Sequence, residues 1–128
     1  MKNENPVLEA KRYVENARTI LREMAGKQDY RYNDPKYVKL AGHAAYTGVL
    51  VALDSFFKGK KKGRKDVSWY QEQLASTDKK VLDNFVSAYQ LLHLSMSYDG
   101  NADFSTAKSG LWHADEIIHW VEQRTATC

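Results

Sequence analysis

The sequence has very few of the residues that cross-link or interrupt a chain. Its 128 residues include one cysteine, Cys128, and two prolines, Pro6 and Pro35. A single cysteine excludes an internal disulfide and a cysteine-based metal centre, so the core must hold the fold together. A chain of this length buries about two thirds of its unfolded surface, which is enough without cross-links. We therefore expect one domain over residues 1–128.

Long apolar runs and strand-like alternation are also missing. The longest apolar stretch, residues 41–57, is interrupted by Thr47, Asp54 and Ser55, so we expect no segment to cross a bilayer. The first residues carry no apolar run and do not resemble a signal peptide, so we expect a cytoplasmic protein with no membrane partner. Alternation of polar and apolar residues never persists beyond a few positions, which argues against a sheet-based fold.

The sequence does have apolar residues at spacings of three and four, which is typical of amphipathic helices. Asn5 and Asp34 each precede a proline, an arrangement that starts helices. The spacing predicts helices over residues 6–26, 35–58 and 66–75, from a cap at Thr77 or Asp78 to a break at 99–101, and from about 103 or 105 onward. Residues 29–33 are expected to form a polar, aromatic turn. These elements predict an all-α fold, an antiparallel four-helix bundle with one additional short helix.

Small residues gather in the first half of the apolar stretch at 41–57. They are Ala41, Gly42, Ala44, Ala45 and Gly48. Glycine costs about 1 kcal/mol relative to alanine inside a helix, so two glycines indicate that another backbone lies close. The stretch therefore predicts a central helix. The core positions expected from the sustained repeats include Val14, Ala45, Val49, Phe85, Leu92 and Leu111.

Positive charge is concentrated in one connection. The chain has 19 Lys and Arg against 16 Asp and Glu, and residues 58–65 hold six of the basic residues and no acid. Nucleic-acid-binding domains usually spread such residues along a face, so we interpret 58–65 as a flexible, solvated loop. The candidate phosphate contacts in it are Lys60, Lys61, Lys62 and Arg64. Any nucleic-acid binding by this loop is expected to be weak, non-specific and sensitive to salt.

Two groups of residues are candidates for ligand binding. His43 and Tyr46 on the central helix form one candidate pocket with His93, although a partly buried histidine bonded to a neighbouring turn is the interpretation that we favour.

The second group is Tyr30, Arg31 and Tyr32, in the first connection. Exposed aromatic side chains next to arginine can stack on bases. A long connection also gains order by packing its tyrosines onto the helices, and we favour this interpretation.

The last helix carries a weak metal motif. Glu116 and His119 have the Glu-x-x-His spacing of di-iron bundles, but such sites need two of these motifs and two further glutamates. Only one motif occurs. Pairing of Asp115 with His119 on the helix surface is the better explanation. His113 lies on a different face from His119, and we expect neither a metal nor a cofactor.

Three segments together resemble the HEPN superfamily, the nucleotide-binding helical bundles of higher eukaryotes and prokaryotes. They are the alanine-rich helix at 10–17, the helix with Ala44-Ala45-Tyr46, and the final helix with residues 112–118. More narrowly, the chain resembles a small bacterial family of uncharacterised HEPN-like proteins, over residues 8–57 and 80–124. The resemblance implies a four-helix core and frequent homodimerisation. Many members are ribonucleases, or toxins paired with a small nucleotidyltransferase.

The catalytic pattern of the superfamily is absent from this chain. Catalytic members carry an arginine followed, after four to six residues, by a histidine. No arginine in this sequence has a histidine at that distance, and the expected region at 90–99 contains His93 without a preceding arginine. No catalytic residue is therefore carried over.

We accordingly expect a non-catalytic HEPN-like interaction or binding module that forms a homodimer and partners a nucleotidyltransferase-type or other protein. The alternative is an RNA-directed protein, either a divergent ribonuclease or the toxin-like half of a pair. A small-molecule-binding or metal enzyme is a third, less supported class.

Overall fold

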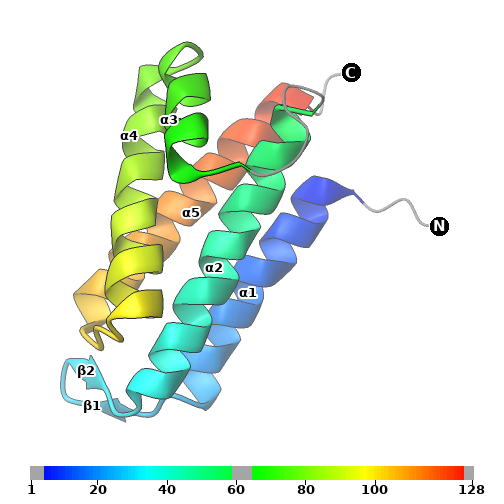
Figure 1. The fold of residues 1–128 in the computed structure, drawn as a ribbon. Coiled ribbons are helices and arrows are strands. Elements are labelled where there is room, and N and C mark those ends of the chain that lie inside the picture. Colours follow the sequence, from blue (N-terminus) through cyan, green and yellow to red (C-terminus); the bar gives the residue numbers. More distant parts are fainter. Residues whose placement is uncertain (1–4, 59–64, 126–128) are drawn as a thin grey trace.

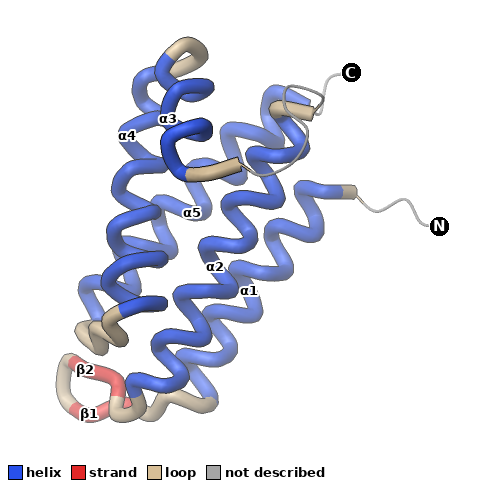
Figure 2. The backbone as a smooth tube through the Cα atoms, viewed as in Figure 1, coloured by secondary structure: helices blue, strands red, loops and turns tan. Residues whose placement is uncertain are grey.

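The computed structural model describes residues 5–58 and 65–125, and most of this part is helical (Figure 1). The helices are α1 (Pro6–Glu23), α2 (Pro35–Phe56), α3 (Val67–Ala75), α4 (Lys79–Ala88), the π-helix η1 (Tyr89–Tyr98) and α5 (Phe104–Thr125). Two short strands, β1 (Lys27–Gln28) and β2 (Arg31–Tyr32), form a hairpin at one end of the molecule (Figure 2). The predicted all-α class is confirmed. No helix in these two ranges is both long and apolar enough to cross a membrane.

Acidic or amide side chains start four of the helices. The side-chain oxygen of Asn5 accepts the backbone N–H of Val7 at 2.9 Å, which caps α1. Asp34, Asp66 and Asp78 cap α2, α3 and α4 in the same way. Such caps satisfy backbone donors that the helix itself leaves unpaired. The predicted starts of α1 and α2 are confirmed, Asp78 is the cap of the two that were considered for α4, and α3 starts one residue later than predicted, with Asp66 as its cap.

The α1–α2 connection contains an element that the sequence did not predict. α1 ends at Glu23, three residues before Gly26, which has a φ of +71°. The chain then forms the hairpin in which Lys27 pairs with Tyr32 and Gln28 with Arg31. Two residues per strand are too few to produce a recognisable alternation of polar and apolar residues. Residues 29–33, which were expected to form only a turn, therefore belong to a hairpin in which a turn joins two short paired strands.

Backbone hydrogen bonds join this hairpin to the segment before α5. The N–H of Tyr32 donates to the carbonyl of Ala102 at 2.9 Å, and the N–H of Phe104 donates to the carbonyl of Tyr30 at 3.1 Å. β2 is therefore bonded on both edges, to β1 on one side and to residues 102–104 on the other. The hairpin is held in place although its strands are short.

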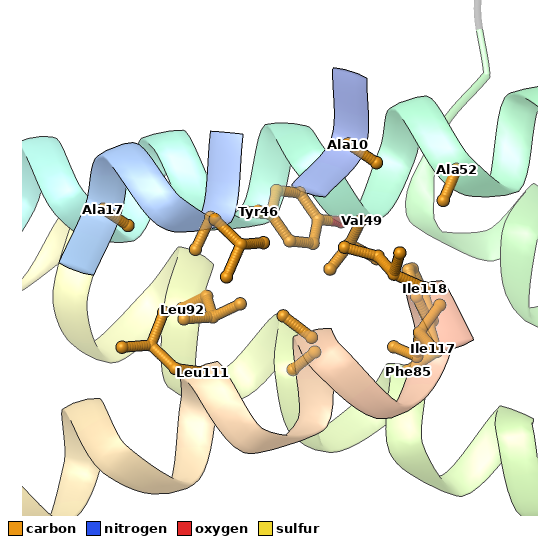
Figure 3. Packing of buried hydrophobic residues seen from close by; sticks show 14 of the residues in the cluster. Ala10, Ala17, Tyr46, Val49, Ala52, Phe85, Leu92, Leu111, Ile117 and Ile118 are labelled. Atoms are coloured by element: carbon orange, nitrogen blue, oxygen red, sulfur yellow. The ribbon is translucent and has the colours of Figure 1, made fainter. Parts of the chain in front are cut away.

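α2 occupies the centre of the helical packing, with contacts to α1, η1 and α5. α1 and α2 lie side by side (Figure 1). Figure 3 shows apolar side chains of several helices converging on one core. The six core residues predicted from the repeats are all buried: Val14, Ala45, Val49, Phe85, Leu92 and Leu111. The three-four spacing therefore identified the buried faces correctly.

The two glycines of α2 mark close contacts with two different helices. A Cβ atom at Gly48 would lie 2.8 Å from the carbonyl oxygen of Ala10 in α1. A Cβ atom at Gly42 would lie 2.7 Å from the carbonyl oxygen of Leu92 and 2.7 Å from the Cβ of Met96 in η1. The predicted close approach of another backbone is confirmed, and both neighbours belong to this chain.

A π-helix replaces the second half of the predicted helix at 78–98. After Ala88 the chain continues as η1, and the N–H of Asp99 still bonds five residues back, to the carbonyl of Leu94, at 2.9 Å. π-helices are rare and are usually limited to one turn. Apolar residues four apart, such as Leu92 and Met96, are compatible with both helix types, so the spacing did not distinguish them.

Candidate functional site

An open groove of about 1070 Å³ lies at the hairpin end of the molecule. It is lined by the hairpin, the segment before α5 and the first residues of α5. Pockets for small molecules usually have volumes of about 300–1,000 Å³, so this groove is large enough for one. The lining side chains that bear on its chemistry are Tyr30, Arg31, Tyr32, Asp103, Phe104 and Lys108.

The turn of the hairpin holds Tyr30 out in solvent. Asp29 has a φ of +59°, in a region that few residues other than Gly, Asn and Asp enter. Tyr30 follows it and is 83% exposed, the largest exposure among the large hydrophobic side chains of the described residues. Its backbone carbonyl is fixed by the hydrogen bond from Phe104. An exposed aromatic ring therefore extends from a backbone that the fold holds in place.

Tyr32 packs instead of facing solvent. Its ring lies on that of Phe104 with the centroids 4.7 Å apart, and burial raises the pKa of its hydroxyl. The packing interpretation favoured for the tyrosines is correct for Tyr32 and wrong for Tyr30. Residues two apart in a strand point to the same face, but Tyr30 lies in the turn before β2, so the two tyrosines are placed differently.

Charged side chains of both signs surround the groove. Arg31 forms an ion pair with Asp103 at 3.3 Å, and both side chains are more than half exposed. The ammonium of Lys27 lies 5.9 Å from the centroid of the Phe104 ring, and Lys108 lines the groove from α5. The groove lining thus carries two cations, Arg31 and Lys108, and two carboxylates, Asp29 and Asp103, while Lys27 lies outside the lining.

The other predicted pocket is only partly assembled. The rings of Tyr46 and His93 stack with centroids 5.0 Å apart, and Tyr89 stacks on His93 at 5.3 Å. Burial raises the pKa of Tyr46. His43, in contrast, is exposed, so the expectation that it is partly buried is wrong. Tyr89 was missed, although its position four residues before His93 places both on one helix face.

The polar cluster predicted on α5 is divided among different partners. Asp115 pairs with Arg18 of α1, and the Nδ1 atom of His119 lies 4.0 Å from Glu122. The predicted pairing of Asp115 with His119 is therefore wrong, because a longer cation on the adjacent helix reaches Asp115. Within residues 5–58 and 65–125, no three His, Cys, Asp or Glu side chains gather as metal ligands.

His113 belongs to a contact between α4 and α5 that the sequence did not indicate. Its Nδ1 atom lies 2.8 Å from the side-chain oxygen of Asn84, which is only 9% exposed. Burial lowers the pKa of His113. Asn84 lies among apolar positions of α4, and nothing in its own helix indicates a partner on α5.

The basic loop is described only at its ends. Lys60, Lys61, Lys62 and Arg64 lie outside the described residues. At the end of the loop, the ammonium of Lys65 lies 3.5 Å from the carboxylate of Asp54. Lys65 is therefore engaged with the helices, whereas the loop was expected to be solvated throughout.

Asp54 also accepts a hydrogen bond from the hydroxyl of Tyr70, at 2.6 Å. Burial, together with this carboxylate, raises the pKa of Tyr70. The contact joins α2 to α3 beside the end of the basic loop. Polar atoms therefore hold α3 against α2 in addition to its buried side chains.

Comparison with known proteins places the chain in a family. Residues 5–123 match the family described as a domain of unknown function, DUF5618. A solved structure of a protein of unknown function from Dyadobacter fermentans is 55% identical in sequence and superposes with a TM-score of 0.91. That similarity covers 97% of this chain and 99% of the other. No curated protein matches the chain. With nearly its whole length matched, the chain belongs to the DUF5618 family.

Proposed function

We propose that this protein is a non-catalytic binding module that uses the groove at the hairpin end. The observation that supports this most is the exposed ring of Tyr30, which borders a groove of about 1070 Å³ and extends from a hydrogen-bonded backbone. Tyrosine is one of the residue types enriched among the few side chains that contribute most of the binding energy at interfaces.

The proposal includes an HEPN-like architecture. α1, α2, α5 and the continuous α4–η1 segment would be the four helices of an antiparallel bundle, with α3 as the additional short helix. The contacts of α2 with three of these elements, and of α4 with α5, support this assignment. The exposed apolar side chains of Leu40 and Leu94 are candidates for a homodimer interface, and sedimentation velocity at several concentrations tests it. A protein partner of nucleotidyltransferase type belongs to the same proposal.

The surroundings of His93 support the absence of catalysis. Its ring stacks with Tyr46 and Tyr89 in the packing between α2 and η1. A general base needs a reacting group within hydrogen-bonding distance and a partner that orients it. Aromatic stacking provides neither, so the divergent-ribonuclease alternative has less support than the binding module.

A ribonuclease assay tests the catalytic part of the proposal. Purified protein incubated with a generic RNA should leave it intact, both with and without divalent cations. His93→Ala serves as the matched variant. Cleavage by the native protein that disappears in His93→Ala would overturn the proposal and favour the RNA-directed alternative.

A fragment screen tests the binding part. We expect small aromatic fragments to shift amide resonances of residues 28–33 and 102–105 in ¹⁵N-labelled protein. Hits that map only to other surfaces, or a complete absence of hits, would show that the groove is not a binding site.

A further inference from the structure

We infer that α3 is a lid that opens as a unit while the other helices stay folded, and that the hydrogen bond from Tyr70 to Asp54 is its latch. α3 lies beside α4, toward the end of the molecule opposite the hairpin (Figure 1). The inference therefore concerns a different region from the groove and does not depend on the proposed function.

The packing of α3 differs from that of the long helices. α5 packs against α1, α2, α4 and η1, whereas within residues 5–58 and 65–125 α3 packs extensively against α4 alone. Two of its nine residues are buried, Tyr70 and Leu74. A segment with few buried side chains can separate at a lower free energy than global unfolding requires. α3 is therefore the helix that we expect to open first.

Aromatic rings join α3 to the helices beneath it. The ring of Trp69 meets that of Phe57 edge-on, with the centroids 5.7 Å apart, and the ring of Tyr70 lies 5.8 Å from that of Phe85. Phe57, at the end of α2, and Phe85, in α4, are both buried in the closed structure. Opening of α3 takes one ring away from each of them. The open form therefore presents apolar surface that the closed form covers.

Asp54 of α2 connects α3 to the rest of the molecule through a shared carboxylate. The hydroxyl of Tyr70 donates to this carboxylate at 2.6 Å. The ammonium of Lys65, in the segment just before α3, lies 3.5 Å from the carboxylate and 5.7 Å from the centroid of the Trp69 ring. Hydrogen bonds to charged groups contribute more to stability than those between neutral groups. α3 cannot move away from α2 without breaking this bond, so the bond acts as the latch.

Hydrogen exchange detected by NMR tests the lid in the native protein. The amides of residues 71–75 should share one opening free energy, and their protection should be about tenfold or more below that of the central amides of α2 and α5. Their exchange should also respond less steeply to low concentrations of urea, because a partial opening exposes less surface than global unfolding. Equal protection and equal urea dependence in α3 and α5 would overturn the inference.

A substitution far from α3 separates the lid from the remaining helices. Val14 is buried in α1, so Val14→Ala should destabilise the packed helices and speed the exchange of the central amides of α2 and α5. The exchange of residues 71–75 should not change, because the other helices are folded in both the closed and the open form. Equal acceleration in α3 would mean that it opens only when the whole protein unfolds.

Tyr70→Phe tests the latch, because it removes the hydroxyl and keeps the ring. Exchange of residues 71–75 should become about tenfold faster, the lower end of the range for losing a hydrogen bond to a charged group, because the Asp54 side chain is 44% exposed. Amides that exchange through global unfolding should accelerate by the same factor, since both routes break the bond. Tyr98→Phe, at a tyrosine that is 76% exposed, is the matched control and should change nothing.

A double-mutant cycle decides whether the two side chains act together. In the Asp54→Ala background, Tyr70→Phe should have no further effect on the exchange of residues 71–75. If the two substitutions multiply each other's effects, or if Tyr70→Phe alone leaves α3 exchange unchanged, the hydrogen bond is not a latch and this part of the inference is wrong.

Discussion

The middle of α2 and the hairpin end differ in how closely their residues are packed. At Gly42 and Gly48 there is no room for even a methyl group, because backbone atoms of η1 and α1 lie within 2.8 Å of a Cβ position. At Tyr30 an entire aromatic ring is left in solvent. Substitutions in the first region should therefore change the free energy of unfolding, and substitutions in the second should change only binding. The comparison predicts that folding and recognition are separable in this protein.

The largest effect is expected from enlarging the glycines of α2. Gly42→Leu or Gly48→Leu should lower the free energy of unfolding by about 1–3 kcal/mol or more, because neither η1 nor α1 can move away cheaply. Urea denaturation measures this change. Ser109→Leu, at an exposed position of a long helix, is the control and should change stability little. Unaltered denaturation midpoints in both glycine variants would contradict the close packing.

Ala45→Leu tests the same region through a residue that already has a Cβ. Ala45 is fully buried, so the larger side chain must displace its neighbours, and we expect a loss of about 1–3 kcal/mol. The midpoint of thermal unfolding should fall accordingly. A midpoint equal to that of the parent would show unoccupied space beside α2.

The partial burial of His113 between α4 and α5 should make stability depend on pH. The pKa of His113 is lower in the folded protein than in the unfolded chain. At pH values near and below the unfolded pKa, the unfolded chain therefore binds more protons than the folded protein does. Stability should therefore fall as the pH decreases from about 7 through the unfolded pKa of about 6.5 toward 5. His113→Gln should flatten this part of the profile. Equal slopes in the parent and His113→Gln would contradict the linkage.

The smallest effects on stability are expected at the hairpin tip and in the basic loop. Tyr30→Ala should stay within about 0.5 kcal/mol of the parent, because the ring makes few contacts. Replacement of Lys60, Lys61, Lys62 and Arg64 by glutamine should have an equally small effect, and should remove only weak, salt-sensitive nucleic-acid binding. Calorimetry and titrations at two salt concentrations measure both quantities. A marked destabilisation by Tyr30→Ala would remove the distinction between the two regions.

The features that were predictable from the sequence are those encoded within one element. Asn5 and Asp34 precede prolines and mark helix starts, and the buried positions repeat every three or four residues. The glycines of α2 indicated close neighbours because they are unfavourable in a helix without such a reason.

The features that were missed depend on a partner elsewhere in the chain. Asp115 pairs with Arg18 across α1 and α5, and Asn84 meets His113 across α4 and α5. The spacing within a single helix contains no information about which neighbour faces it. The candidate site was predictable only in part for the same reason: residues 30–32 were identified, but the segment at 102–104 that completes the groove was not.

The π-helix makes the groove beside the hairpin sensitive to the number of residues in η1. A residue added to or removed from an α-helix rotates everything after it by about 100°. η1 leads directly into residues 99–104, whose end supplies the backbone partners of Tyr30 and Tyr32. The twist of η1 thus determines the direction in which the chain leaves this helix and approaches the hairpin. A one-residue insertion within 89–98 that leaves the turns unchanged would rotate residues 102–104 relative to β2 and would turn the groove's second wall away from its first.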